Sequence, residues 1–379
     1  MIVPAPPPAG RSATAGEAAR VLVCDDSAVI RSAIARLLES DGRVRVAARV
    51  GDGQQALEAV KRERFDVAVL DIEMPVMDGM TALPLLLKAD PGLRVVMAST
   101  LTTHGAEIVL RALRLGAADY IPKPSVGAIA DDSFRRELLA KVLGLARLRR
   151  QEAGTARSAA EAMLRPGRAA GREVPLLLAV GSSTGGPQAL FTLVQGLGRA
   201  VPVPVVITQH MPATFTPILA EHLGRLGGLP CAEARDGEPL AAGRLYVAPG
   251  DRHLLVEGRA GVLRVRLSDG PAVNFCRPAV DPMLQSAAAA CAGRVLVVML
   301  TGMGHDGRDG TRAVVEAGGT ALAQDEATSV VWGMPGAVVE TGLCHRVLPL
   351  SALAGQALDL LGGKARGWPP QPARIGLPA

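Results

Sequence analysis

Short apolar runs alternate with helix-like stretches from Arg20 to about Leu145. The apolar runs predict strands at 21–25, 44–50, 66–70, 94–99 and 118–121. The stretches between and after them predict helices at 28–39, 54–63, 80–88, 105–114 and 132–150. Strands that alternate with helices in this way indicate a doubly wound parallel sheet. We therefore expect an α/β domain over residues 20–145.

A second alternation of the same kind begins at Pro175. Its predicted strands are 176–181, 204–208, 244–248, 294–300, 319–323 and 345–348, with a hairpin over 251–267. Its predicted helices are 187–196, 214–225, 280–291, 309–317 and 351–361. The fold class is therefore expected to be α/β, with a second doubly wound parallel sheet of the Rossmann-like kind over residues 175–365.

Three segments lack this alternation. Residues 146–174 hold seven Arg among Ala and Gly and almost no large apolar residue, which predicts a basic linker. A solvated connector is the favoured reading of this linker, and a docking site for an acidic partner is the alternative. Residues 1–19 and 366–379 are rich in Pro and small residues, which predicts a disordered leader and a disordered tail.

The composition of the chain argues against several classes of protein. The chain has 379 residues, of which 49% are hydrophobic and 20% charged, as in globular proteins. No apolar run of about 18 residues predicts a membrane span. Only 2% of residues are aromatic, and 41 basic residues face 36 acidic ones, so we expect no nucleic-acid partner. Five scattered cysteines without a CxxC pair predict neither zinc nor disulfides, which suits the cytoplasm.

Polar residues gather where the strands of the first domain end. Asp25 and Asp26 follow the first strand, Asp71 the third, Ser99 the fourth and Lys123 the fifth. Each alone is explained as a turn, cap or surface residue, but the carboxyl ends of parallel strands share one edge of a sheet. Carboxylates that converge there suit Mg²⁺, which binds oxygen ligands and phosphate.

The segments VLVCDDS, VLDIEMPVMDG, VVMAST and ADYIPKP resemble the receiver domain of two-component response regulators, over residues 20–145. The resemblance implies a flavodoxin-like fold and phosphorylation of Asp71 by a histidine kinase of the CheA type. It implies that Asp25, Asp26 and Asp71 bind Mg²⁺ with a backbone carbonyl near Glu73. It also implies two switch residues that contact the phosphoryl group, Ser99 and Lys123.

A serine turn follows the first strand of the second domain. Ser183 is the central serine of GSSTG, which fits the G-x-S-x-G pattern of a nucleophile on a strand-to-helix turn. A helix-capping turn or a phosphate loop explains the same letters, although the Walker lysine is missing. His210 ends the next strand and Asp306 follows a later one. The order Ser, His, Asp differs from that of α/β-hydrolases, but a triad is defined by geometry.

The glycine-rich segment that contains Asp306 also fits the pattern of a dinucleotide-binding site. Gly302 to Gly307 matches G-x-G-x-x-G after a strand, and Asp325 follows about where a ribose-binding acid lies. Against a dinucleotide site, Asp306 places a carboxylate where the pyrophosphate binds. The turn also comes late in the domain instead of in its first βα unit.

Six segments together favour the hydrolase. GSSTGG, ITQHMPATFT, YVAPGDRH, NFCRPAVDPML, LTGMGHDG and AQDEATSVVWGMPGAV, in this order behind a receiver, resemble the CheB family of chemotaxis protein-glutamate methylesterases. The resemblance implies Ser183 as nucleophile, His210 as general base and Asp306 as the group that orients it. It implies that the backbone N–H of Met303 helps to hold the oxyanion.

The family resemblance also implies substrate and partners. The substrate is the glutamyl γ-methyl ester of chemoreceptors, with glutamine deamidation as a second activity, and the esterase reaction needs no cofactor. Two residues depart from the family pattern, His305 for Ala and Ala279 for Ser. The alternatives are a sensory array that does not control flagella, an inactive interaction protein and a DNA-binding regulator. The intact triad and the absence of a helix-turn-helix segment argue against the last two.

Overall fold

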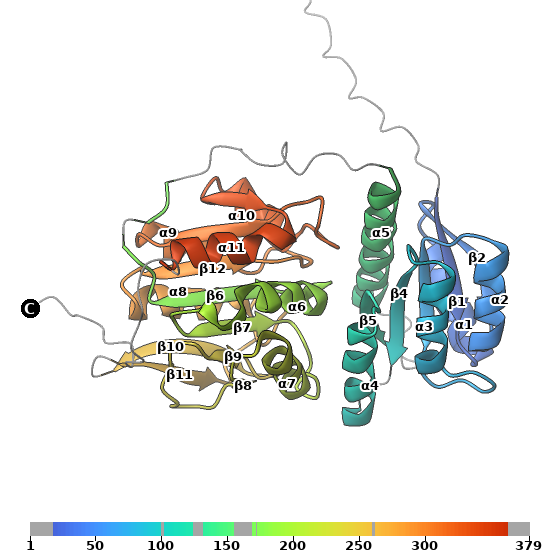
Figure 1. The fold of residues 1–379 in the computed structure, drawn as a ribbon, viewed down its shortest axis with the longest axis horizontal. Helices are drawn as coiled ribbons and strands as arrows, with labels where there is room; N and C mark the ends of the chain where they lie inside the picture. The colour runs from blue at the N-terminus through green and yellow to red at the C-terminus, as the bar shows by residue number, and fades with distance from the viewer. Residues whose placement is uncertain are drawn as a thin grey trace, which may run out of the picture.

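The computed structural model describes residues 18–99, 102–123, 132–154, 169–171, 173–259 and 262–362. These residues form two α/β domains that lie side by side (Figure 1). We call residues 18–154 the N-terminal domain and residues 173–362 the C-terminal domain. Each domain is built on a parallel sheet, as the two alternations in the sequence predict.

The N-terminal sheet has the strand order β2-β1-β3-β4-β5, and all its strands are parallel. Its strands are β1 (Ala19–Cys24), β2 (Val44–Val50), β3 (Val67–Asp71), β4 (Arg94–Ser99) and β5 (Asp119–Pro122). Its helices are α1 (Ala28–Glu39), α2 (Gly53–Arg62), α3 (Gly79–Ala89), α4 (Thr103–Arg114) and α5 (Asp132–Gly154). This order confirms the doubly wound fold. It places the reversal of winding between β1 and β3, where such sheets bind ligands.

Helices of this domain begin at polar residues that satisfy free backbone N–H groups. The side chains of Ser27, Asp52, Asp78 and Thr102 each accept a hydrogen bond from an N–H in the first turn of α1, α2, α3 and α4. Such caps stabilise a helix by about 1 kcal/mol each. They fix the helix starts within two residues of the predicted ones.

The C-terminal sheet has the order β14-β13-β12-β6-β7-β9-β8, again with parallel pairs throughout. Its strands are β6 (Leu177–Ser182), β7 (Val205–Gln209), β8 (Cys231–Glu233), β9 (Leu245–Val247), β12 (Val295–Met299), β13 (Thr320–Gln324) and β14 (Arg346–Leu348). The antiparallel hairpin of β10 (His253–Arg259) and β11 (Val262–Ser268) confirms the predicted one.

The winding of the C-terminal sheet reverses between β6 and β12. Its helices are α6 (Gly186–Leu197), η2 (Gly198–Ala200), α7 (Thr216–Gly227), α8 (Val280–Ala290), α9 (Arg308–Glu316), α10 (Met334–Glu340) and α11 (Leu350–Leu360). The carboxyl ends of β6, β7 and β12 are therefore neighbours, and this edge is the expected site of chemistry.

Some elements differ from the sequence prediction. The short strand β8 and the short helix α10 were not predicted. Helix α5 runs to Gly154, four residues beyond the helix predicted over 132–150, and so takes in the start of the segment 146–174 that we expected to be a linker. Leu145 and Ala146, where helix and linker predictions meet, are buried within a hydrophobic cluster. The rest of that linker up to residue 168, the leader to residue 17 and the tail from residue 363 lie outside the described residues.

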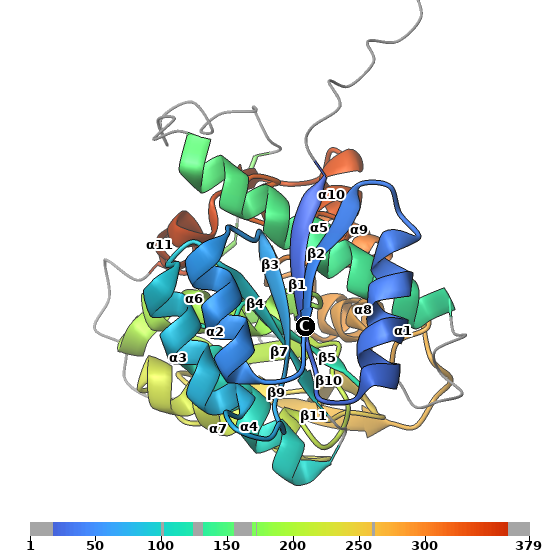
Figure 2. The ribbon, with the colours of Figure 1, turned by 90° about the vertical axis from the view of Figure 1, so that its right-hand side faces the viewer.

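The two domains touch through α4, β5 and α5 of the N-terminal domain (Figure 1). In Figure 2 the N-terminal domain lies in front of the C-terminal domain. The rings of Tyr120 and Phe215 stack across the boundary with centroids 4.9 Å apart. Gln188 Nε2 donates to the carbonyl oxygens of Leu113 and Ala117, at 2.6 and 2.5 Å. The contact is thus made of specific packing and hydrogen bonds between the domains.

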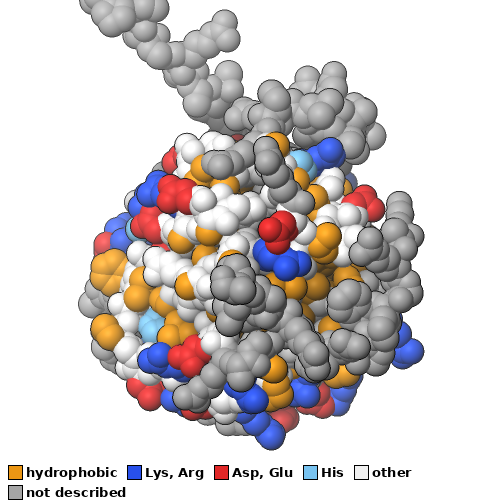
Figure 3. Space-filling model, turned by 90° about the vertical axis from the view of Figure 1, so that its left-hand side faces the viewer, with side chains coloured by type: hydrophobic (Ala, Val, Ile, Leu, Met, Phe, Trp, Pro, Cys, Tyr) orange, Lys and Arg blue, Asp and Glu red, His pale blue; other side chains and the backbone are white. Residues whose placement is uncertain are grey.

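The opposite face of the C-terminal domain carries acidic and basic side chains in a mixed pattern (Figure 3). A nucleic-acid surface has clustered Lys and Arg, and the described residues on this face form no such field. None of the described helices combines the length and the apolar composition needed to cross a membrane.

Candidate active site and candidate phosphorylation site

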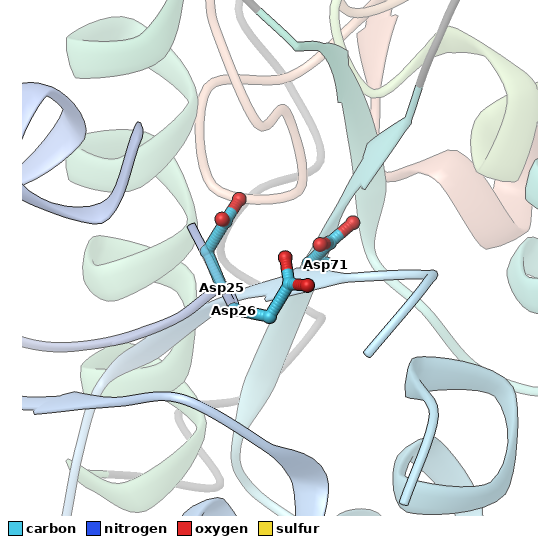
Figure 4. A group of neighbouring side chains, drawn as sticks. All are labelled: Asp25, Asp26 and Asp71. Carbon is cyan, nitrogen blue, oxygen red and sulfur yellow. The ribbon is translucent and has the colours of Figure 1, made fainter. Parts of the chain in front are cut away.

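Three carboxylates converge at the carboxyl edge of the N-terminal sheet (Figure 4). Asp25 and Asp26 follow β1 and Asp71 ends β3, and one oxygen from each lies within 4.8 Å of the others. Asp25 and Asp71 are each 1% exposed. Lys123 Nζ lies 2.6 Å from Asp71 Oδ2 and 3.7 Å from Asp25 Oδ2. The predicted acidic residues and the predicted lysine therefore share one pocket.

This acidic pocket fits Mg²⁺ by its chemistry. Burial raises the pKa of Asp25 and of Asp71 above the ordinary value, against the opposing effect of Lys123. Asp25 Oδ2 is buried, and no hydrogen-bond donor for it occurs among the described residues. A buried carboxylate oxygen beside two other carboxylates is stabilised by a hard divalent cation, which prefers oxygen ligands. The residues present therefore suit this ion.

The remaining predicted residues of this domain line the same pocket. Ser99, at the end of β4, is 3% exposed and lies in the pocket wall with Asp71, Glu73 and Lys123. The backbone N–H of Glu73 donates to Asp71 Oδ1 at 3.3 Å. Asp71 is thus held on a short turn, with a hydroxyl and an ammonium group nearby.

Ser183 lies on a tight turn between β6 and α6, as G-x-S-x-G predicts. Its N–H donates to the Thr301 carbonyl at 3.0 Å, which ties the turn to the segment after β12. Gly185 has a φ of 72°, a conformation that favours glycine. A Cβ on Gly186 would lie 2.0 Å from Gln209 Oε1, so this position has no room for a side chain. The glycines of the motif therefore shape the turn.

His210 and Asp306 form a direct pair at the same edge of the sheet. His210 Nε2 lies 2.7 Å from Asp306 Oδ2. Burial acts to lower the pKa of His210, but hydrogen bonds to Asp306 and Cys276 outweigh it and raise the pKa to about 9. Burial acts to raise the pKa of Asp306, but the hydrogen bond to His210 outweighs it and lowers the pKa to about 2. The two groups thus favour an imidazolium–carboxylate pair.

The Asp306 carboxylate is held by many donors. The N–H groups of Val280, Asp281 and Gly307 donate to it at 2.6, 3.1 and 3.0 Å. Asn274 Nδ2 adds a fourth hydrogen bond at 3.0 Å. These donors leave this carboxylate pointing at His210, which is the orientation that a triad requires.

Ser183 and His210 directly follow the paired strands β6 and β7, and no hydrogen bond between the Ser183 hydroxyl and the His210 ring occurs in the described part of the chain. The other ring nitrogen, Nδ1, lies 3.4 Å from Cys276 Sγ. Catalytic hydrogen bonds are often long in free enzymes and form when substrate binds. Since Nε2 faces Asp306, Nδ1 is the nitrogen that remains for a proton from Ser183.

The Gln209 side chain links Ser183 and His210 through hydrogen bonds to their backbone carbonyls. Its Nε2 donates to the carbonyls of Ser183 and His210, at 2.9 and 3.0 Å. Its Oε1 accepts from the hydroxyl of Ser182 at 2.7 Å. Ser182 is fully buried, and its hydroxyl is engaged with Gln209.

Met303 lies in the turn after β12, close to Ser183. A Cβ on Gly302 would lie 2.9 Å from Ser183 Cβ, so the backbone at this point touches the serine. Among the described residues, nothing accepts a hydrogen bond from the N–H of Met303. His305 is exposed beside it. Asp325, the acid of the dinucleotide alternative, accepts hydrogen bonds from Thr328 instead.

Three contacts of the site come from residues that sequence spacing did not indicate: Gln209, Asn274 and Cys276. Asn274 and Cys276 lie in the segment NFCRPAVDPML, in the loop between the hairpin strand β11 and α8, and this segment fits no catalytic pattern. They reach His210 and Asp306 because the loop before α8 folds back over the edge of the sheet. The resemblance of this segment to the CheB family is the signal in the sequence that could have indicated a role for Asn274 and Cys276.

A receiver-type domain followed by a parallel α/β domain with a Ser, His and Asp at one edge defines a response regulator with a hydrolase-like output domain. Comparison with known families agrees. The family described as response regulator receiver domain matches residues 21–133, and the family described as CheB methylesterase matches residues 178–357. The chain belongs to the CheB methylesterase family.

Similar proteins cover nearly the whole chain. A protein-glutamate methylesterase/protein-glutamine glutaminase of Rhodospirillum centenum is 53% identical, over 88% of this chain and 92% of its own. A protein of the same name from Azospirillum brasilense is 51% identical, over 92% of this chain and 95% of its own. The crystal structure of the Thermotoga maritima CheB methylesterase catalytic domain is 40% identical, with a TM-score of 0.48, over 49% of this chain and 98% of that one.

Proposed function

We propose that this protein is a phosphorylation-activated serine esterase that hydrolyses glutamate γ-methyl esters on chemoreceptors. The observation that carries the proposal is the His210–Asp306 pair, 2.7 Å apart, at the sheet edge where Ser183 sits on its turn. The names of the similar proteins give both esterase and glutaminase activities, so we include deamidation of receptor glutamines. The receiver is assigned to residues 20–145 and the methylesterase domain to residues 175–365.

The chemistry follows from the positions of these groups. Ser183 Oγ attacks the ester carbonyl and gives its proton to His210, while Asp306 stabilises the imidazolium that forms. The N–H of Met303 donates to the developing oxyanion. His210 then gives the proton to the departing methanol. A water molecule, deprotonated by His210, attacks the acyl-enzyme and releases glutamate and Ser183.

Cys276 is the second candidate nucleophile, because its Sγ lies 3.4 Å from His210 Nδ1. A Cys–His–Asp arrangement performs the same acyl transfer in other enzymes. The backbone around Ser183 favours the serine, since this residue sits on the sharp turn at a helix start, beside Gly302 and Met303. Replacement of each nucleophile in turn decides between them.

Phosphorylation is proposed to occur on Asp71. Asp25, Asp26 and Asp71 would hold Mg²⁺, which would offset the charge of the phosphate oxygens. Lys123 would pair with the phosphoryl group, and Ser99 would donate a hydrogen bond to it. The phosphodonor would be a histidine kinase of the CheA type. The protein would act in the cytoplasm on the cytoplasmic helices of methylated receptors, without insertion into the membrane.

The N-terminal domain is proposed to restrain the esterase by direct contact. The N–H of Gly185, two residues after the nucleophile, donates to Asp119 Oδ2 of the N-terminal domain at 3.0 Å. Asp119 is buried and pairs with Lys141 at 3.4 Å. Added charge on Asp71 would shift the contact through β5 and α5, which lie between the two sites.

The experiment is methanol release from receptor membranes that carry methyl esters. We expect release by the full chain, faster release with acetyl phosphate and Mg²⁺, and no release by Ser183→Ala. An equal rate with and without the donor, when Asp71 is shown to be phosphorylated, would contradict the regulation but not the esterase activity. Absence of release in both samples would contradict the activity.

A further inference from the structure

A two-residue turn beside the catalytic pair has an unusual residue at its tip. Val273 and Cys276 exchange two backbone hydrogen bonds, at 3.1 and 2.9 Å, and enclose Asn274 and Phe275. Asn274 has a φ of 52° and Phe275 a φ of 63°. Turns with two positive φ angles strongly favour Asn followed by Gly. Phe275 therefore occupies a position where glycine is expected, at a cost in backbone strain.

The two residues that flank Phe275, Asn274 and Cys276, hold this turn against the active site. Asn274 Nδ2 donates to Asp306 Oδ1 at 3.0 Å and to Asp281 Oδ2 at 2.8 Å. Cys276 Sγ lies 3.4 Å from His210 Nδ1. The residues on both sides of Phe275 thus contact the catalytic pair, so the direction of the Phe275 side chain is set relative to the reacting groups.

The Phe275 side chain is not buried against any described part of the chain. It is 104% exposed even with the N-terminal domain in contact with the C-terminal domain. Among the described residues of the C-terminal domain, the exposed large hydrophobic side chains are Val174, Phe275 and Met303. Two of these three lie on the loops of the active site. Strained backbone that supports an exposed aromatic ring indicates a role in binding.

We infer that Phe275 is a specificity-determining anchor that packs on an apolar side chain of the receptor helix, next to the glutamyl ester. The inference rests on the proposed function and names the part of the substrate that the site recognises beyond the ester. Met303, 38% exposed and next to Gly302, whose backbone touches Ser183, adds a second apolar contact. A few aromatic residues dominate most protein interfaces, and they are rigid when the backbone below them is held.

The test compares two substrates on the full chain. Phe275→Gly removes the ring and suits the positive φ, so the variant is expected to fold with an unchanged or higher melting temperature. The ratio of kcat/KM on methylated receptors to kcat/KM on 4-nitrophenyl acetate is expected to fall about tenfold, because the small ester lacks the helix. Phe275→Tyr keeps the ring and should restore the ratio to within twofold of the unsubstituted chain.

Val174→Gly is the matched control, since Val174 is exposed but precedes β6, at the opposite edge of the sheet from Ser183. It should leave the ratio unchanged. The inference is overturned if Phe275→Gly keeps the ratio, or if both substrates lose activity in parallel, which would mean that the residue only supports the triad. If the unsubstituted chain releases no methanol, the proposed function fails before the variant is tested.

Discussion

Replacement of Gly144 by alanine is expected to open the contact between the two domains. Gly144 lies in α5, and a Cβ at this position would be 1.9 Å from the carbonyl oxygen of Val330 in the C-terminal domain. A backbone atom cannot move away as a side chain can, so the docked arrangement must shift. Alanine is also the better helix former by about 1 kcal/mol, so the N-terminal domain itself should remain folded.

The size of the effect follows from the cost of overpacking, which is about 1–3 kcal/mol. If docked molecules outnumber open ones by a hundred to one, the free energies of the two forms differ by about 2.7 kcal/mol. A change of about 1–3 kcal/mol multiplies the ratio of open to docked molecules by roughly 5 to 160. The open fraction would then rise from about 1% to between about 5% and 60%, and activity without phosphate would rise in proportion.

The assay is methanol release by the full chain without phosphodonor, for the unsubstituted protein and for Gly144→Ala. Gly355→Ala is the control, because Gly355 also lies in a helix but a Cβ there meets nothing within 4 Å. We expect no change for the control. If Gly144→Ala is folded by circular dichroism and its rate without phosphate equals that of the control, the contact seen here does not restrain the esterase.

Three further predictions address the site. Ser183→Ala should lower methanol release on the order of 10⁴-fold, whereas Cys276→Ala should stay within tenfold of the original rate; the reverse result would make the thiol the nucleophile. Asp71→Asn, or removal of Mg²⁺ by chelation, should hold the rate at its level without donor when acetyl phosphate is added, as measured by the same assay. His210 must be neutral to act as a base, so its pKa of about 9 predicts that kcat/KM rises with pH up to about 9. Asp306→Asn removes the charge that holds the proton, so the rise in residual activity should move to lower pH; a pH profile of unchanged position would contradict the pairing.

Local patterns carry much of the fold and the site. The strands are buried apolar runs, so their positions can be read from the chain. The alternation of strands and helices does not by itself fix the β2-β1-β3-β4-β5 order, in which β3 pairs with β1 and not with β2. Because parallel strands end at one edge, residues such as Asp71, at the end of β3, and Ser183, just after β6, can be placed at that edge before the structure is known. Strand β8 and helix α10 are too short to give a periodic signal.

What the sequence by itself determined is therefore the set of elements and the residues at their ends. Only the tertiary structure decided which side chains meet across long separations. Cys276 reaches His210 from the loop between the hairpin strand β11 and α8, which is outside the parallel sheet, and Asp119 reaches Gly185 across a domain boundary. Gly144 must be glycine because Val330 packs on it. Periodicity describes how a segment faces its own core, and it holds no information about a partner from another element or another domain.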